Sequence, residues 1–262
     1  MCTIIVRHGM DDWCTTIIAS NRDEFYDRPS SGPLVLRADP LVIGGRDERE
    51  GGTWFGLTPA GFFAGLTNQR SFGVRHDTLR SRGGLVVDVL AKRSLEEAKR
   101  FLAGVDPRSY NEFNLIFGDG VELCVAYGRG EEAEIEIEPI SSGVHVLCND
   151  RLGSPEFPKA DKARERVASI PPAPWHGLRG GLAEVLADRS LPDPAEVPSL
   201  PPDAPFDREV ARRLQAIYVE TPVYGTVSST IAAVSPGRVH EYQFTEGLPT
   251  EVGFKDMLNL TR

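Results

Sequence analysis

The stretch CTIIVRHGMDDWCTTIIAS (residues 2–20) decides the class of fold. Two apolar runs rich in β-branched residues, 2–7 and 13–20, flank a short loop that contains Gly9, Asp11 and Asp12. So short a connection joins neighbouring antiparallel strands, and we therefore expect a β-hairpin. The apolar residues are consecutive, whereas a strand with one exposed face alternates apolar and polar residues. The stretch thus predicts strands that are covered on both faces.

The same pairing of strand-like runs recurs along the rest of the chain. Three further pairs flank turns rich in Gly and Pro, and they are the runs 52–58 with 62–67, 113–117 with 121–127, and 227–234 with 238–244. Each pair predicts another β-hairpin. One more strand is expected at 144–148. The sheets should therefore be largely antiparallel.

Helical patterns supply the layers that such strands need on their outer faces. They cover the stretches 83–92, 95–103, 159–168, 182–187 and 208–214. Ser94 and Glu97 have the spacing of a capping box, which favours the second of these helices. We therefore expect an α+β fold, a four-layer αββα sandwich in which two antiparallel sheets pack together and helices cover them.

The chain length and the distribution of prolines bear on the number of domains. A chain of 262 residues fits one large domain or two small ones. Nine prolines between residues 171 and 205 surround one helical stretch and predict an irregular segment on the surface. A flexible linker between two domains is the alternative. We expect a single domain over residues 1–262, because strands lie on both sides of this segment and no shift in composition divides the chain.

Charge and hydrophobicity exclude several classes of protein. The net charge of −9 argues against nucleic acid as a partner, because a phosphate-binding face needs clustered Lys and Arg. No apolar run reaches the length of a membrane-spanning helix. Arg7, His8, Asp11 and Asp12 interrupt the start of the chain before a signal-peptide core can form. We therefore expect a cytoplasmic protein without a transmembrane segment, and the oligomeric state stays open.

Signals for a metal or cofactor are weak. The four cysteines form no CxxC pair and the five histidines have no metal-ligand spacing, so we expect neither a metal nor a cofactor. The glycine-rich stretch 44–56 lacks the spacing of a phosphate-binding P-loop and predicts a tight loop before a strand. Cys14, Cys124 and Cys148 lie in apolar runs, where a cysteine is typically a small buried hydrophobe.

Cys2 differs from the other cysteines by its position. If Met1 is removed, Cys2 carries both a thiol and a free α-amine. The α-amine, with an ordinary pKa near 7.7 to 8.0, can accept the thiol proton directly or through one water. It would then serve as the general base for a nucleophilic thiolate without a histidine. The alternative is that Cys2 is simply the first apolar residue of an edge strand.

Three groups of polar residues follow apolar strands, and the first of them should lie near Cys2 in the expected hairpin. Arg22 and Asp23, in the cluster 20–30, return beside residue 2, where Arg22 can stabilise a thiolate and Asp23 can hold the α-amine or orient the thiol. For Glu24, Asp27 and Arg28 we expect a solvated loop with salt bridges. Two amides also end strands, and they can face a developing oxyanion or simply begin turns; they are Asn68 and Asn149.

These segments together resemble the NRDE family, which includes the transport and Golgi organisation protein 2 group. The resemblance is carried by MCTIIV at the start, NRDEF (21–25), GGTWFGL (51–57), GLTNQR (65–70), LCNDRLGSPEFPKADKAR (147–164) and YGTVSSTI (224–231). That family resembles the cysteine branch of the N-terminal nucleophile hydrolases, whose fold is the αββα sandwich. One departure is Val227, because in the family an arginine often follows the YGT segment.

The resemblance implies roles for particular residues. It implies that Cys2 is the nucleophile, that Asp23 and Arg22 match the arginine and aspartate motif of the branch, with Asp23 the better match, and that Asn68 is an oxyanion donor. Asn149 resembles either an oxyanion donor or the asparagine that orients the amine. We therefore expect a cofactor-free hydrolase that acts on a linear amide or acyl bond of a small molecule. The alternative is a non-enzymatic protein that binds a lipid or haem-like ligand in secretory organisation or metabolite trafficking.

Overall fold

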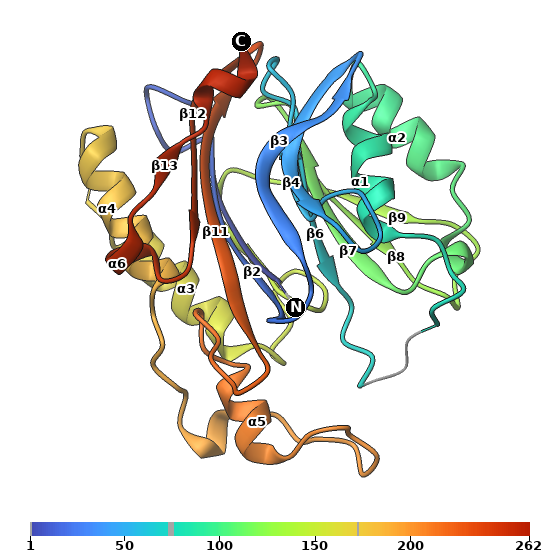
Figure 1. Cartoon of the computed structure of the whole chain (residues 1–262), viewed down its shortest axis with the longest axis vertical. Coiled ribbons are helices and arrows are strands. Elements are labelled where there is room, and N and C mark those ends of the chain that lie inside the picture. The colour runs from blue at the N-terminus through green and yellow to red at the C-terminus, as the bar shows by residue number, and fades with distance from the viewer. Residues whose placement is uncertain (1, 73–75, 172) are drawn as a thin grey trace.

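The computed structural model describes residues 2–72, 76–171 and 173–262, and its strands form two antiparallel sheets (Figure 1). One sheet has six strands, in the order β10 (Gly143–Leu147), β1 (Cys2–His8), β2 (Thr16–Phe25), β11 (Tyr224–Ser235), β12 (Arg238–Glu246) and β13 (Lys255–Asp256). The other has seven, in the order β3 (Ser30–Ala38), β4 (Leu41–Asp47), β5 (Phe55–Leu57), β6 (Phe63–Asn68), β7 (Phe113–Gly118), β8 (Leu123–Gly128) and β9 (Glu136–Ile140). All four predicted hairpins form, and the predicted strand 144–148 is β10.

Helices cover the outer face of each sheet, which gives four layers (Figure 1). The seven-stranded sheet carries α1 (Arg82–Leu90) and α2 (Leu95–Ala103), and the six-stranded sheet carries α3 (Pro158–Ala168) and α4 (Trp175–Leu186). Two short helices, α5 (Arg208–Arg213) and α6 (Pro249–Val252), and three 3-10 turns, Pro107–Ser109, Pro194–Glu196 and Leu258–Thr261, complete the elements of the described residues. The predicted αββα sandwich is confirmed.

Strand β1 shows why its apolar residues are consecutive. Ile4 and Val6 pack into the core between the two sheets, whereas Ile5 packs into the core beneath α3 and α4. Each of these three side chains is at most 1% exposed. Because both faces of the strand are covered, neither face needs polar residues.

The NRDE segment belongs to a strand and not to a loop that follows one. Strand β2 continues to Phe25, and its register pairs Cys2 with Arg22 and Thr3 with Asn21. The expected return of residues 20 to 24 beside residue 2 is therefore confirmed. Asn21 is buried on the helix side, where its amide donates to the carbonyls of Leu186 and Ile217 at 2.9 Å each. Asn21 thus fastens the end of α4 to the sheet.

Several expected boundaries differ from the structure. The predicted loop at Gly44–Asp47 is the end of β4, because Gly44 pairs with both β3 and β5. Ser94 accepts from the Glu97 N–H, as a capping box requires, but the Glu97 carboxylate accepts from Arg93 N–H instead of Ser94 N–H. Only half of the predicted capping box therefore forms.

The proline-rich segment 171–205 contains more helix than the sequence predicts. Helix α4 begins at Trp175, seven residues before the predicted start at 182, and three glycines in its first turns hid the pattern. Its apolar side chains Leu178, Leu182 and Val185 are buried against the sheet. The rest of the segment leads to α5 and lies beyond one end of the sandwich, at the bottom of the view in Figure 1.

No helix within the described part of the chain is both long enough and apolar enough to cross a membrane.

Candidate active site

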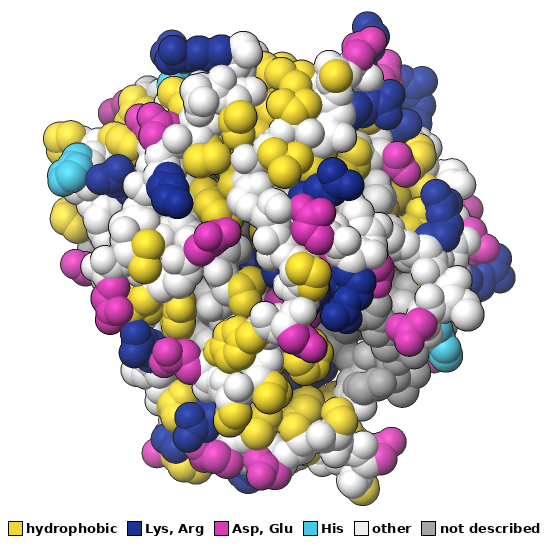
Figure 2. Space-filling view, in the orientation of Figure 1, with side chains coloured by type: hydrophobic (Ala, Val, Ile, Leu, Met, Phe, Trp, Pro, Cys, Tyr) yellow, Lys and Arg dark blue, Asp and Glu magenta, His cyan; other side chains and the backbone are white. Residues whose placement is uncertain are grey.

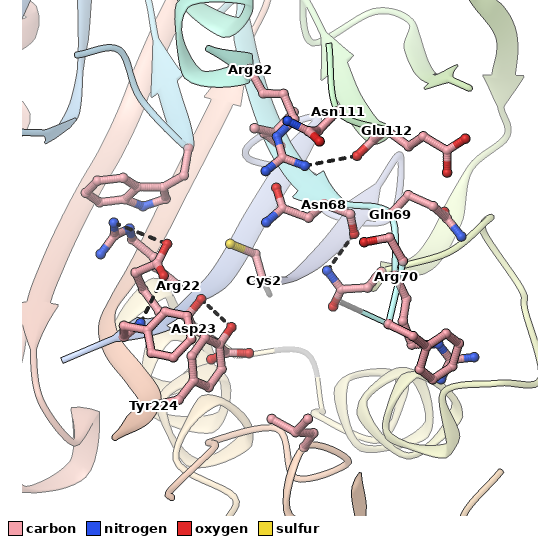
Figure 3. Close-up of a pocket in the computed structure, with 18 of the residues that line it drawn as sticks. Cys2, Arg22, Asp23, Asn68, Gln69, Arg70, Arg82, Asn111, Glu112 and Tyr224 are labelled. Carbon is pink, nitrogen blue, oxygen red and sulfur yellow. Dashed lines mark hydrogen bonds and ion pairs between the residues drawn. The ribbon is translucent and has the colours of Figure 1, made fainter. Parts of the chain in front are cut away.

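Cys2 lies in a cavity of about 1030 Å³ at one end of the two sheets. Its position at the start of β1 leaves its side chain half-buried. Arg22, Asp23, Asn68 and Asn149 line the same cavity, so the five residues that the sequence singled out lie together. Figure 3 shows the sulfur of Cys2 near the centre, with the Asn68 side chain above it and Asp23 below. Met1 lies outside the described residues.

The surroundings of Cys2 keep its thiol protonated. Burial raises the pKa of the Cys2 thiol, and the Asp23 carboxylate acts in the same direction. Arg22 and a hydrogen bond with the Asp23 backbone oppose these effects and lower the pKa, but burial outweighs them. A nucleophilic Cys2 at this place therefore needs a base that takes up its proton.

Arg22 shares the cavity face of the sheet with Cys2, because the two residues are register partners. Its guanidinium lies over the Trp54 ring, 4.3 Å from the ring centroid, and its Nη1 donates to Ser30 Oγ at 3.3 Å. Two carboxylates, Glu24 and Asp47, lie 3.8 Å from its Nη2. These contacts hold the planar guanidinium in one orientation beside the thiol.

Arg28 corrects the expectation of a solvated loop after the NRDE segment. Its side chain is 9% exposed and lines the cavity, and its Nη2 lies 2.7 Å from the Asp47 carboxylate. Glu24 and Glu50 lie 3.7 and 3.5 Å from the same guanidinium. The network therefore forms one side of the cavity. The sequence did not indicate this because Asp47 and Glu50 come from another hairpin.

Asp23 points to the helix side of the sheet, opposite to Arg22. Its Oδ1 accepts from Thr226 Oγ1 at 2.6 Å, and its backbone oxygen accepts from the Tyr224 hydroxyl at 2.7 Å. Its Oδ2 lies 3.8 Å from the ammonium nitrogen of Lys159 on α3, and both side chains are fully buried. Burial raises the pKa of Asp23, whereas Lys159 and the Thr226 hydroxyl lower it.

Lys159 is a site residue that the sequence interpretation missed. It precedes Ala163 and Val167 by four and eight residues, and these two face the core. That spacing was the available signal, because it places Lys159 on the buried face of the predicted helix.

The two asparagines are joined directly. Asn149 Nδ2 donates to the backbone oxygen of Asn68 at 2.7 Å, and Asn149 is 0% exposed. Its Oδ1 is buried and accepts no hydrogen bond from the described residues. One Nδ2 hydrogen and the Oδ1 acceptor thus remain available. The carboxamide is equipped both for an oxyanion and for an amine N–H.

The apolar side of the cavity comes from the end of the proline-rich segment and from α5. Val197, Leu200, Phe206, Val210 and Leu214 line it. Figure 2 shows hydrophobic side chains gathered at the lower end of this face, over the segment that leads to α5. The sequence predicted only an irregular surface segment here, because nothing local indicates which cavity it closes.

The departure at Val227 lies outside the cavity. Val227 is the extra residue of a β-bulge in β11, between Thr226 and Ser228, and its side chain does not line the cavity. Among the described residues, five arginines line it, and they are Arg22, Arg28, Arg70, Arg82 and Arg108. Within residues 2–72, 76–171 and 173–262, no group of three or more His, Cys, Asp or Glu side chains has the arrangement of a metal site.

Comparison with known proteins gives a family and a fold. The sequence model of a family described as Transport and Golgi organisation 2 matches residues 1–247. The Transport and Golgi organization protein 2 homolog of Bos taurus is 33% identical over 236 residues, which are 83% of this chain and 81% of the bovine protein. The human homolog is 32% identical over 234 residues, again 83% and 81% of the two chains.

Two solved structures share the architecture. A Caenorhabditis elegans N-acylethanolamine-hydrolyzing acid amidase ortholog has a TM-score of 0.56 and 15% identity, over 88% of this chain and 92% of that one. A mutant of the conjugated bile acid hydrolase from Clostridium perfringens has a TM-score of 0.54 and 14% identity, over 100% and 94%. The chain therefore has the fold of the N-terminal nucleophile hydrolases.

Proposed function

We propose a function for the chain, which belongs to the Transport and Golgi organisation 2 family: it hydrolyses a linear amide or related acyl bond of a small molecule, with Cys2 as an N-terminal nucleophile. The observation that carries this proposal is the cavity itself. A cysteine that one cleavage would make N-terminal shares a cavity of about 1030 Å³ with Arg22, Asp23, Asn68 and Asn149. The names of the two solved structures with this fold, an amidase and a bile acid hydrolase, agree with that chemistry.

In this mechanism the α-amine of Cys2 is the base that the thiol needs, because the raised pKa of the thiol keeps it protonated near pH 7. The amine takes the thiol proton as Cys2 Sγ attacks the carbonyl carbon, and the carbonyl oxygen becomes an oxyanion. Asn68 and a backbone N–H stabilise that oxyanion. The amine then gives its proton to the leaving nitrogen as the C–N bond breaks, and an acyl-thioester remains on Cys2. Water hydrolyses the thioester and releases the acid.

Asn149 fits the amine-orienting role better than the oxyanion role. Its Nδ2 already donates to Asn68, whereas its buried Oδ1 accepts no hydrogen bond from the described residues. A carbonyl oxygen in that state is ready to accept an N–H of the Cys2 amine. Asp23, on the adjacent strand, would then hold the amine from the helix side.

The first test is the replacement of the nucleophile. Cys2→Ala should reduce the hydrolysis of a panel of acyl p-nitroanilides by about 10³-fold or more, because the acyl-thioester cannot form. The melting temperature should change little, since Cys2 is half-buried at the end of a strand. The matched control is Cys124→Ala, a buried cysteine of the seven-stranded sheet, which should keep full turnover.

A second control separates the thiol from the amine. The intact mass first establishes that Met1 is removed from the purified protein. An N-terminal Gly-Ser extension then leaves the Cys2 thiol in place but converts its amine into a peptide bond. Turnover should be lost in this form as well. Undiminished turnover in Cys2→Ala, or in the extended form, would rule out the mechanism.

The apolar side of the cavity supports a second candidate function. Val197, Leu200, Phe206, Val210 and Leu214 would hold an apolar ligand with no need for turnover. In that case Cys2 would be an ordinary protonated thiol, as its raised pKa permits. Tight binding of an apolar probe, combined with labelling of Cys2 by iodoacetamide no faster than that of a free peptide thiol, would favour the binding function.

A further inference from the structure

Burial of the Lys159 ammonium group costs free energy, and the packing of α3 does not require a charged side chain at this position. Its side chain is 0% exposed on the inner face of α3, and its ammonium group makes no hydrogen bond with any described residue. Lysine is almost never fully buried unless it is paired, because its charge loses hydration. An apolar residue at position 159 would pack here without that loss. We therefore expect a role of the ammonium charge in its contacts with other elements.

The partner of Lys159 is a residue of the proposed active site. The ammonium nitrogen lies 3.8 Å from Asp23 Oδ2, and the Asp23 side chain is also 0% exposed. Asp23 follows Arg22, the register partner of Cys2, so the buried pair lies under the N-terminal end of β1. Thr226 Oγ1, on the neighbouring strand β11, donates to Asp23 Oδ1 at 2.6 Å and fixes the carboxylate.

The other titratable groups around Asp23 do not replace Lys159. Cys148, which follows β10, has a pKa raised to about 11 by burial, and Tyr224 on β11 also has a raised pKa, so both are neutral near pH 7. Glu24 on β2 raises the pKa of Asp23 further. Arg22 on β2 and Cys2 on β1 point to the cavity side, where Arg22 lies between Glu24 and Asp47. Within the described residues, Lys159 is a cation that faces Asp23 from the helix side.

We propose that Lys159 is a positioning residue of the active site, whose buried ammonium group keeps the Asp23 carboxylate ionised beside the N-terminal cysteine. This inference rests on the proposed function. An ionised Asp23 can hold the Cys2 amine by a charge-assisted hydrogen bond, whereas a protonated carboxyl group cannot. Lys159 touches neither the thiol nor the substrate and acts through Asp23.

Removal of the Lys159 ammonium group should destabilise the Cys2 thiolate, whether Asp23 stays ionised or takes up a proton. If Asp23 stays ionised, its unopposed carboxylate disfavours the thiolate. If Asp23 takes up a proton, its own effect on the thiol is removed, but the amine loses its charged partner and is less readily held as the ammonium that stabilises the thiolate. The second change is the larger one, because the amine lies on the same residue as the thiol. In both cases the thiolate forms at higher pH, by about one unit or more.

The experiment measures the rate at which iodoacetamide alkylates Cys2 between pH 5 and 10, by mass spectrometry of the N-terminal peptide. Lys159→Met should move the midpoint of this pH profile upward by about one unit. Lys159→Arg keeps the cation and should restore the midpoint. The matched control is Lys162→Met, because Lys162 lies on the same helix, is 36% exposed and pairs with Asp188 at 2.9 Å. It should leave the profile unchanged.

A measurement on the unsubstituted protein covers the case in which Lys159→Met does not fold. The ¹³Cγ chemical shift of Asp23, assigned by through-bond correlation, should report an ionised carboxylate at pH 7. A protonated Asp23 at pH 7 would overturn the inference, because Lys159 would then not keep the carboxylate ionised.

The outcomes separate the inference from the proposed function. A reactive Cys2 whose midpoint is the same in Lys159→Met and Lys162→Met would overturn the inference alone. Equal midpoints in Lys159→Arg and Lys159→Met would also overturn it, because the charge would not be the cause. A Cys2 in the unsubstituted protein that is alkylated no faster than a free peptide thiol at any pH would overturn the proposed function, and the inference with it.

Discussion

At the scale of single residues, the cavity combines a thiol whose pKa is raised with the polar side chains of Arg22, Asn68 and Asn149. Burial raises the pKa of the Cys2 thiol and outweighs the effects that lower it, among them those of Arg22 and of a backbone hydrogen bond with Asp23. A cysteine within the chain has no α-amine and would need another group as its base. In the proposed mechanism, removal of Met1 would give Cys2 a base of its own, which would make its position in the chain more important than the local sequence.

Asn149 offers a direct test of how the amine is oriented. Asn149→Ala should lower kcat by about 10²-fold, because both its Oδ1 acceptor and its bond to the Asn68 backbone are lost. KM should change little, since Asn149 binds no remote part of the substrate. Steady-state kinetics with the best p-nitroanilide measures both quantities.

The neighbouring amide Gln69 provides the control for Asn149. It also lines the cavity, but its Nε2 donates to Asp150 at 3.1 Å. Gln69→Ala should therefore keep kcat within a few fold, and the melting temperatures of both variants show whether the fold is kept. An Asn149→Ala enzyme as active as Gln69→Ala would refute the assigned role.

At the scale of elements, successive side chains of the NRDE segment point to opposite faces of the sheet, because the segment is part of strand β2. Arg22 faces the cavity, whereas Asn21 and Asp23 face the helices. Asn21 bonds the end of α4 and accepts from Ser229 Oγ at 2.6 Å, so its part is structural. The segment thus builds the site on one face and fastens the helical layer on the other.

The connection after α4 makes the stability of this layer dependent on pH. Burial raises the pKa of Asp188, but hydrogen bonds from Ser190, Lys162 and Arg166 outweigh it and lower the pKa to about 2. The unfolded chain has the ordinary value near 3.9. Because the folded-state pKa is the lower one, the stabilisation is present above pH 4 and is lost as the pH falls toward 2.

Asp188→Asn should therefore lower the melting temperature at pH 7 by about 2–4 °C, the shift that about 1 kcal/mol produces in a domain of this size. Near pH 2 the variant and the unsubstituted protein should melt together. Differential scanning calorimetry at both pH values measures this. Asp161→Asn is the control, because Asp161 pairs with Arg164 on the exposed side of α3. An equal loss at pH 2 and pH 7 would contradict the assignment.

At the scale of the whole molecule, the cavity exists because segments from both sheets and from the proline-rich stretch meet at one end of the sandwich. The two sheets and the connection between β2 and β3 supply its polar side, with Arg22, Asn68 and Arg28. The stretch that leads to α5 supplies its apolar side, with Phe206 and Leu214. A substrate that fills it should accordingly be amphipathic, with its apolar part toward α5.

Leu214→Glu tests that division of the cavity. The substitution should weaken the binding of the amphiphilic dye 1-anilinonaphthalene-8-sulfonate about tenfold or more, because the apolar rings of the dye lose a Leu-sized contact worth about 1.5–3 kcal/mol. Fluorescence titration gives the Kd. The control is Val121→Glu, which adds the same charge at a side chain 63% exposed in the β7–β8 turn and outside the cavity. Equal Kd values for the two variants would refute an apolar side at Leu214.

The sequence by itself determined the sandwich and the residues gathered at its end. Consecutive apolar residues in runs such as 2–7, joined by short turns, leave a chain few choices except antiparallel strands buried on both faces. The hairpin register then brings Arg22 and Asp23 back to Cys2, because a short loop fixes which residues pair. Local patterning sufficed wherever the partners lie close along the chain.

Only the tertiary structure decided what surrounds those residues. The pairing of Lys159 with Asp23, the bond from Asn149 to Asn68, and the closure of the cavity by Leu214 join segments between 81 and about 210 residues apart. Such contacts follow from how the layers stack, and a periodicity of two or four residues carries no information about them. The chemistry proposed for Cys2 could be inferred from the sequence, whereas the groups proposed to tune it could be identified only from the assembled layers.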